Sequence, residues 1–89
     1  MKTASAVIAA AGQAVAGPCT VYSVTVVADA VNPCVIEVRD GGVAGEIRAY
    51  VGAPTSSTGG LQFRGTGFIT DVWITGVNIE GVTVEYMPD

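Results

Sequence analysis

The segment "GGLQFRGTGFITDVWITG" spans Gly59–Gly76 and decides the fold class. Two glycines precede a short apolar stretch, and Gly65-Thr66-Gly67 leads into residues 68–75, which alternate in polarity as a half-buried strand does. A dinucleotide-binding loop would need a glycine at Thr70 and a helix after it, and both are missing from the pattern. We therefore predict that Gly65-Thr66-Gly67 is a corner between two strands.

The remainder of the chain repeats this pattern of short alternating segments. Residues 19–29, 34–40, 45–51 and 82–86 are rich in Val, Ile, Thr and Tyr, and turn signals such as Asn-Pro and Asp-Gly-Gly separate them. In segment 45–51 we expect Ile47 to point inward and Arg48 and Tyr50 to point outward. The pattern predicts an all-β fold, a single antiparallel β-sandwich of six to eight short strands, either jelly-roll-like or a small barrel.

The N-terminal segment 1–17 supports two interpretations. We predict that residues 1–89 form one domain and that this segment is a strand or arm, with a strand over 5–11 and a turn at Gly12-Gln13. Ala14-Val15-Ala16 also fits the cleavage site of a signal peptide. The apolar run is too short for a membrane span, so no membrane partner is expected.

The composition points to a surface that contacts other protein. Charged residues make up 13% of the 89 residues, against about 25% in typical soluble domains. A monomer in water normally carries more surface charge, so we expect a homo-oligomer. With four basic residues against eight acidic ones, the chain offers no basic patch for nucleic acid.

No residue set in the sequence suggests catalysis, and we predict that the chain is not an enzyme. The chain has no His, so its Ser and Thr residues lack the usual activating base, and no cofactor or metal motif is present. All eight acidic residues are expected to be solvated. Cys19 and Cys34 are expected to be reduced and buried, with one disulfide as the alternative.

Trp73 is the most informative single side chain. In the segment 68–75, Phe68, Val72 and Ile74 share the face expected to be core, while Ile69 and Trp73 lie on the other face. Exposed aromatic residues on such faces often supply interface contacts. We therefore name three interface candidates, which are Trp73, Ile69 and Tyr50. Alternation alone leaves open whether Trp73 faces a core or a neighbouring subunit.

Five runs of the sequence carry a family resemblance: "AGPCTVYSVTVVAD", "VIEVRDGG", "GEIRAYVGAP", "GGLQFRGTGFITDVWITG" and "VTVEYMPD". They resemble small virion structural proteins of tailed bacteriophages, with residues 59–68 and 82–86 matching best. The resemblance implies a homotrimeric capsid decoration or cement protein that binds the major capsid protein in the virion, after assembly in the host cytoplasm. A tail, head–tail or fibre accessory subunit is one alternative. A secreted or periplasmic binding module with a signal peptide is another.

Overall fold

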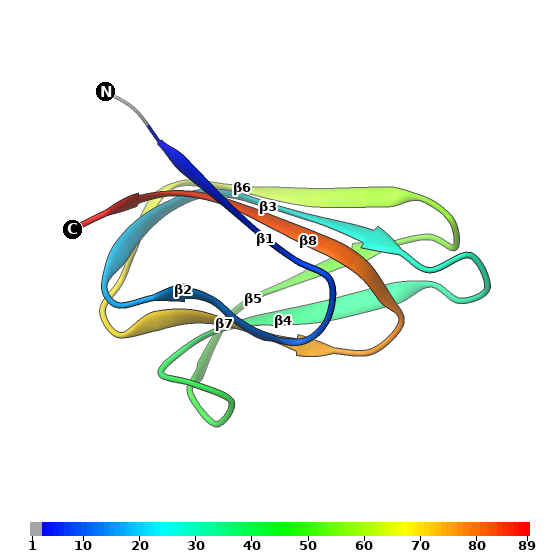
Figure 1. The fold of residues 1–89 in the computed structure, drawn as a ribbon, viewed down its shortest axis with the longest axis horizontal. Helices are drawn as coiled ribbons and strands as arrows, with labels where there is room; N and C mark the ends of the chain where they lie inside the picture. Colours follow the sequence, from blue (N-terminus) through cyan, green and yellow to red (C-terminus); the bar gives the residue numbers. More distant parts are fainter. Residues whose placement is uncertain (1–2) are drawn as a thin grey trace.

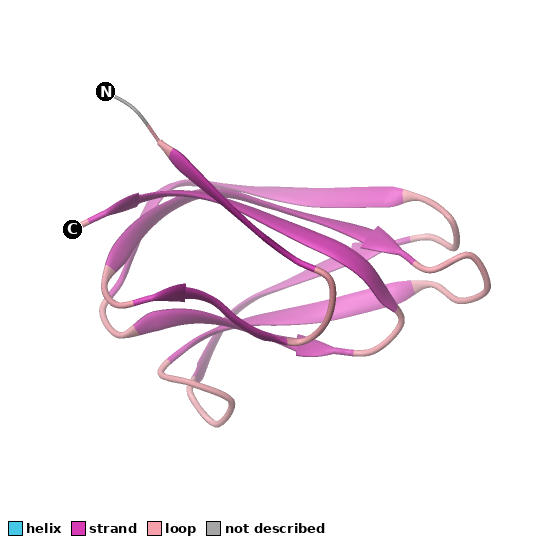
Figure 2. Ribbon diagram, viewed as in Figure 1, coloured by secondary structure: helices cyan, strands magenta, loops and turns pink. Residues whose placement is uncertain are grey.

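The computed structural model describes residues 3–89, which form eight β-strands and no helix (Figure 2). The strands are β1 (Ala4–Ile8), β2 (Gly12–Ala16), β3 (Cys19–Ala28), β4 (Cys34–Asp40), β5 (Glu46–Ala53), β6 (Thr58–Phe68), β7 (Asp71–Gly76) and β8 (Ile79–Pro88). They form two four-stranded antiparallel sheets, sheet A in the order β1-β8-β3-β6 and sheet B in the order β2-β7-β4-β5 (Figure 1). The predicted antiparallel β-sandwich is confirmed.

The strand order is that of a jelly roll. Every connection between consecutive strands crosses from one sheet to the other, except the β4–β5 hairpin, which stays within sheet B. This wrapping of an eight-stranded chain around a common core is the jelly-roll arrangement.

Because consecutive strands run in opposite directions, the turns gather at two ends of the sandwich. One end carries turns 17–18, 41–45 and 69–70, and we call it the Ile69 end. The other carries turns 9–11, 29–33, 54–57 and 77–78, and we call it the Val31 end. The strands run along the longest molecular axis, and both chain termini lie toward the Ile69 end (Figure 1).

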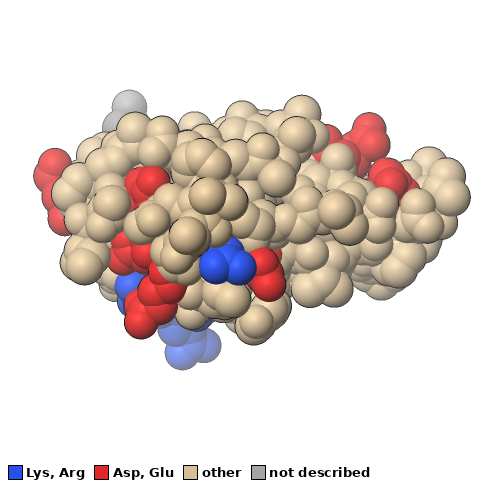
Figure 3. Space-filling model, turned by 90° about the horizontal axis from the view of Figure 1, so that it is seen from below, with Lys and Arg blue, Asp and Glu red and all other residues tan. Residues whose placement is uncertain are grey.

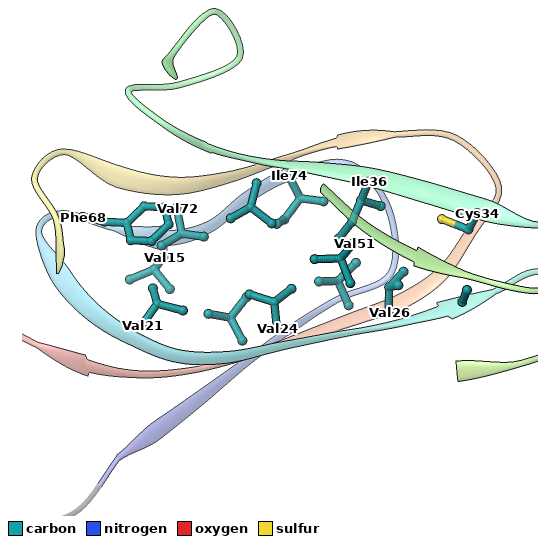
Figure 4. Close-up of a cluster of buried hydrophobic side chains, with 14 of the residues drawn as sticks. Val15, Val21, Val24, Val26, Cys34, Ile36, Val51, Phe68, Val72 and Ile74 are labelled. Carbon is teal, nitrogen blue, oxygen red and sulfur yellow. The ribbon is translucent and has the colours of Figure 1, made fainter. Parts of the chain in front are cut away.

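The core lies between the inner faces of the two sheets. Valine dominates it, because a β-branched side chain packs well on a pleated surface. The buried hydrophobic residues, most of them drawn in Figure 4, are Val15, Cys19, Val21, Val24, Val26, Ala28, Cys34, Ile36, Val38, Val51, Ala53, Phe68, Val72, Ile74, Val82 and Val84. The face of segment 68–75 that was expected to be core, with Phe68, Val72 and Ile74, is buried as predicted.

Two predicted turns are misplaced. The first turn lies at residues 9–11, where Ala9, Ala10 and Ala11 are exposed, and Gly12 and Gln13 instead begin β2. Alanine carries no turn signal, whereas the Gly-Gln pair does, so the sequence favoured the wrong position.

Gly65-Thr66-Gly67 is not a corner between strands. It lies inside β6, where Arg64 and Gly65 adopt positive φ angles of 55° and 84° and the pairing with β3 shifts register. The glycine allows a bulge that bends one continuous strand. The turn between strands comes at residues 69–70.

Strand β5 also departs from the predicted alternation. Arg48 is an extra residue opposite the Val38–Arg39 step, so the strand changes phase there. As a result Ile47 is 37% exposed. Arg48 turns inward, and its guanidinium carbon lies 4.9 Å from the centre of the Phe68 ring.

A close approach of β5 to β6 explains one glycine in the opening segment. A Cβ atom added to Gly59 would lie 1.8 Å from the carbonyl oxygen of Gly52. This oxygen belongs to the backbone, so it cannot move aside as the end of a flexible side chain could. Gly67, in the same strand, has open space at the equivalent position. The two glycines therefore form a matched pair for testing the packing of the β5–β6 corner.

We predict that Gly59→Ala destabilises the protein by about 1–3 kcal/mol, because the added methyl group forces the two strands apart. Gly67→Ala should change the free energy of unfolding by less than about 0.5 kcal/mol. Urea unfolding of both variants measures the difference. Equal midpoints for the two variants would contradict the β5–β6 contact.

Candidate interaction surfaces

Residues 3–89 offer surfaces rather than a cavity. This range contains no detected pocket and no group of three or more His, Cys, Asp or Glu residues placed to hold a metal ion. Within it, no helix has the length and apolar character needed to cross a membrane. The features that could act on a partner are therefore the exposed faces, the two ends and the polar groups that shape them.

Two buried carboxylates join neighbouring turns at the Ile69 end. Asp40 accepts hydrogen bonds from the backbone N–H groups of residues 69–71, at 2.9, 2.9 and 3.3 Å. Asp71 in turn accepts from the N–H groups of Gly41 and Gly42, at 3.0 and 3.1 Å. Asp40 thus holds the turn that ends at Asp71, and Asp71 holds the turn that begins after Asp40. We call this arrangement the aspartate clamp.

Side chains complete the clamp. Gln13 Nε2 donates to Asp71 Oδ2 at 3.0 Å, and Arg48 Nη1 donates to Asp40 Oδ2 at 3.3 Å. All four carboxylate oxygens therefore accept a hydrogen bond, which offsets the cost of removing two charges from water. The β5 bulge is part of this site, because it turns Arg48 toward Asp40.

The expectation that all eight acidic residues are solvated is wrong for this pair. Asp40 is 8% exposed and Asp71 is 6% exposed. The only signal in the sequence was the Asp-Gly-Gly turn, in which Gly41 and Gly42 take positive φ angles of 110° and 83°. Nothing in that signal indicated that the turn amides would bind a carboxylate 29 residues or more away along the chain.

The clamp makes the fold sensitive to acid. Burial by itself would raise the pKa of Asp40, but the three backbone hydrogen bonds and the Arg48 charge together lower it below the ordinary value. Burial likewise opposes a lowered pKa for Asp71, and the hydrogen bonds from Gly41, Gln13 and Gly42 outweigh it. Because the folded-state pKa values are lowered, the stabilisation is present above the unfolded-state value of about 3.9 and is lost as the pH falls through the folded-state values.

A third aspartate orders the Val31 end. Asp29 Oδ1 accepts the N–H groups of Val31 and Asn32 at 2.8 and 2.6 Å. The main chain of Asp29 also donates to the Asn78 carbonyl at 3.0 Å and accepts from the Ser56 N–H at 2.9 Å. Three of the four turns at this end are therefore tied to one another.

The three predicted interface residues do not form one patch. Trp73 is partly exposed on the outer face of sheet B, opposite Arg39 and Gln13, so it is not a residue of the core between the sheets. Tyr50 lies on the same face and is 62% exposed. Ile69 is 82% exposed in the β6–β7 turn, apart from the other two.

Charged groups on the outer face of sheet B are largely paired with one another. Arg39 binds Glu37 at 2.9 Å and donates to the Thr75 hydroxyl at 3.2 Å, while that hydroxyl donates to Glu37 at 2.6 Å. Figure 3 views the molecule from below and shows red and blue side chains close together, with most of the surrounding surface neither acidic nor basic. Strong attraction for a highly charged partner is not expected from such a surface.

Several exposed apolar side chains were not singled out from the sequence. Val31, Val43 and Val77 lie in turns and are 77%, 64% and 72% exposed. Each is a large apolar residue inside a turn. The period-two and period-3.6 patterns used to predict exposure apply to strands and helices, so they give no prediction for a turn residue.

The two cysteines are far apart and buried. Cys19 begins β3 at the Ile69 end and Cys34 begins β4 at the Val31 end. The ten residues of β3 span about 30 Å between these ends, which no disulfide bridges. Burial raises the pKa of both thiols, assisted by nearby carboxylates, and so suppresses the reactive thiolate.

Comparison with known proteins supports the fold. The chain matches no protein-family model and none of the curated proteins. A solved structure of Bacillus endospore appendages, described as disulfide-linked pili, is similar, with a TM-score of 0.55 and 22% sequence identity. The match covers 99% of this chain and 88% of the other. At this identity the likeness shows a shared β-sandwich fold.

The predicted role as a phage capsid decoration protein is wrong, because the similar structure belongs to a bacterial appendage rather than to a virus particle. The short runs that carried the phage resemblance consist of common strand and turn residues, which any small β-sandwich needs. The resemblance itself and the virion localisation stay predictions without a test.

We predict that Asp40→Asn and Asp71→Asn each destabilise the protein by about 1–3 kcal/mol at neutral pH, because the amide nitrogen would face backbone donors. Each variant should also lose less stability than the wild type between about pH 5 and pH 2, since one titrating group is gone. Urea unfolding across this pH range measures both effects. The control is Glu80→Gln, which removes an exposed carboxylate. If the two Asn variants had the same free energy of unfolding and the same pH dependence as this control, the clamp would be contradicted.

Proposed function

We propose that this chain is a noncatalytic structural subunit that associates with copies of itself into an open, appendage-like assembly. The observation that carries the proposal is the combination of many exposed apolar side chains with very few charges. Nine large hydrophobic residues are exposed among residues 3–89. Only 12 of the 89 residues carry charge, as four basic and eight acidic side chains. Exposed apolar surface of this kind favours association with other protein.

The fold is consistent with such a role. The similar solved structure is that of endospore appendages described as a family of disulfide-linked pili, so this β-sandwich architecture occurs in a fibrous assembly. Sharing a fold does not by itself transfer a function, and the proposal therefore depends on the surface of this chain.

Covalent linkage is not part of the proposal. Cys19 and Cys34 are 0% and 1% exposed, so their sulfur atoms cannot reach a neighbouring subunit while the chain is folded. Contact between copies would depend on apolar burial and shape, since the surface carries few ionic groups to pair.

Two features support the noncatalytic part of the proposal. The chain has no His, and residues 3–89 contain no pocket in which a substrate would be sequestered. The buried carboxylates, Asp40 and Asp71, have all their oxygens engaged with protein donors.

Light scattering over a series of protein concentrations tests the proposal. We expect the mass to rise above 9.0 kDa and to keep rising with concentration, with filaments visible by electron microscopy at the highest concentrations. The same curve should be obtained with a thiol reductant. A monomer at every concentration would contradict the proposal. A plateau at three copies, about 27 kDa, would replace the open assembly with the closed trimer that the phage resemblance implied.

A further inference from the structure

Among residues 3–89, the three most exposed large apolar side chains lie in turns at the two ends, and the next, Val7, is 71% exposed on β1. Ile69 is 82% exposed at the Ile69 end, while Val31 and Val77 are 77% and 72% exposed at the opposite end. Val43, in the 41–45 turn beside the 69–70 turn, is 64% exposed. Each end therefore presents two large aliphatic side chains to solvent.

The turns at both ends are nearly free of charge. Turns 17–18, 41–45 and 69–70 of the Ile69 end contain no charged residue. Turns 9–11, 29–33, 54–57 and 77–78 of the Val31 end contain only Asp29, whose carboxylate accepts hydrogen bonds within its own turn. The exposed residues that border these turns are acidic at both ends, Glu46 and Asp89 at the Ile69 end and Glu80 at the Val31 end, so contact between the ends depends on apolar burial and strengthens as salt screens these charges.

These turns are also held in place before any contact is made. The aspartate clamp fixes turns 41–45 and 69–70 relative to each other, and Asp29 joins turns 29–33, 54–57 and 77–78. A rigid surface loses less conformational freedom on binding than a mobile loop does.

We infer that copies of this chain associate head to tail, with the Ile69 end of one copy on the Val31 end of the next. The two ends differ in their residues and in the hydrogen bonds that shape them, so their contact is heterologous and leaves a free end on every copy. Such a contact extends into a filament instead of closing as a dimer. This inference rests on the proposed function and names the surfaces through which the subunit would assemble.

The size of the ends indicates how strong each contact is. The molecule measures 37 × 29 × 17 Å, and its strands run along the 37 Å axis (Figure 1). The widest cross-section, 29 by 17 Å, limits each end to about 490 Å², so two ends bury at most about 1,000 Å², the lower limit for a specific interface. Each contact is therefore weak, and long chains are expected only at high protein concentration.

Two single-end variants test the direction of assembly. Ile69→Lys blocks one end and Val31→Lys blocks the other, and both replaced side chains are exposed, so the fold should be retained. Each variant alone should need at least about tenfold more protein to associate than the wild type does. Mixed in equal amounts, the two should form a dimer of about 18 kDa, twice 9.0 kDa, that does not grow, because each still has one intact end.

The controls separate this inference from the proposed function. Tyr50→Lys places the same charge on the outer face of sheet B and should leave association unchanged. Val43→Lys and Val77→Lys repeat the end substitutions at second positions, and thermal unfolding verifies that every variant folds. If the wild type associates but Tyr50→Lys alone abolishes it, the head-to-tail contact is wrong while self-association stands. A wild type that stays monomeric would overturn both.

Discussion

Asp40 accepts backbone N–H groups from the turn that ends at Asp71, and Asp71 accepts them from the turn that begins after Asp40. This exchange fixes two connections of the jelly roll in one arrangement. The two residues lie on β4 and β7, which are neighbours in sheet B. Their charges are tolerated in a buried position because every oxygen has a donor, one of them from Arg48. The β5 bulge brings Arg48 inward, so this polar contact depends on a local irregularity of the strand that follows Asp40 in the chain.

The same hydrogen bonds shape the surface that we consider functional. A turn that carries an 82% exposed isoleucine would ordinarily be mobile, but the amide of Ile69 is bound by Asp40. At the opposite end, Asp29 orders the turn that exposes Val31. Hydrogen bonds to Asp40, Asp71 and Asp29 thus hold in place the turns that carry four of the nine exposed large apolar side chains of residues 3–89.

Most of the fold followed from local pattern. Alternation along segment 68–75 predicted that Phe68, Val72 and Ile74 are buried, because a strand with one buried face has a period of two. The prediction failed where a bulge shifts the alternation of inward and outward side chains by one residue, as at Arg48 and at Arg64–Gly65. The residue types at a bulge do not distinguish it from a regular strand. The clamp could not be foreseen for a related reason, because it joins groups about 30 residues apart that only the strand order brings together.

Native-state hydrogen exchange, followed residue by residue in the monomer at neutral pH, tests the central claim most directly. The account predicts that the turn amides of Gly41, Gly42, Ile69 and Thr70 exchange slowly, because each is bound to a buried carboxylate. Protection close to that of the core strand amides would show that the clamp is closed in solution. Exchange as fast as that of the exposed turn at residues 9–11 would contradict the clamp and, with it, the ordered end that the proposed assembly requires.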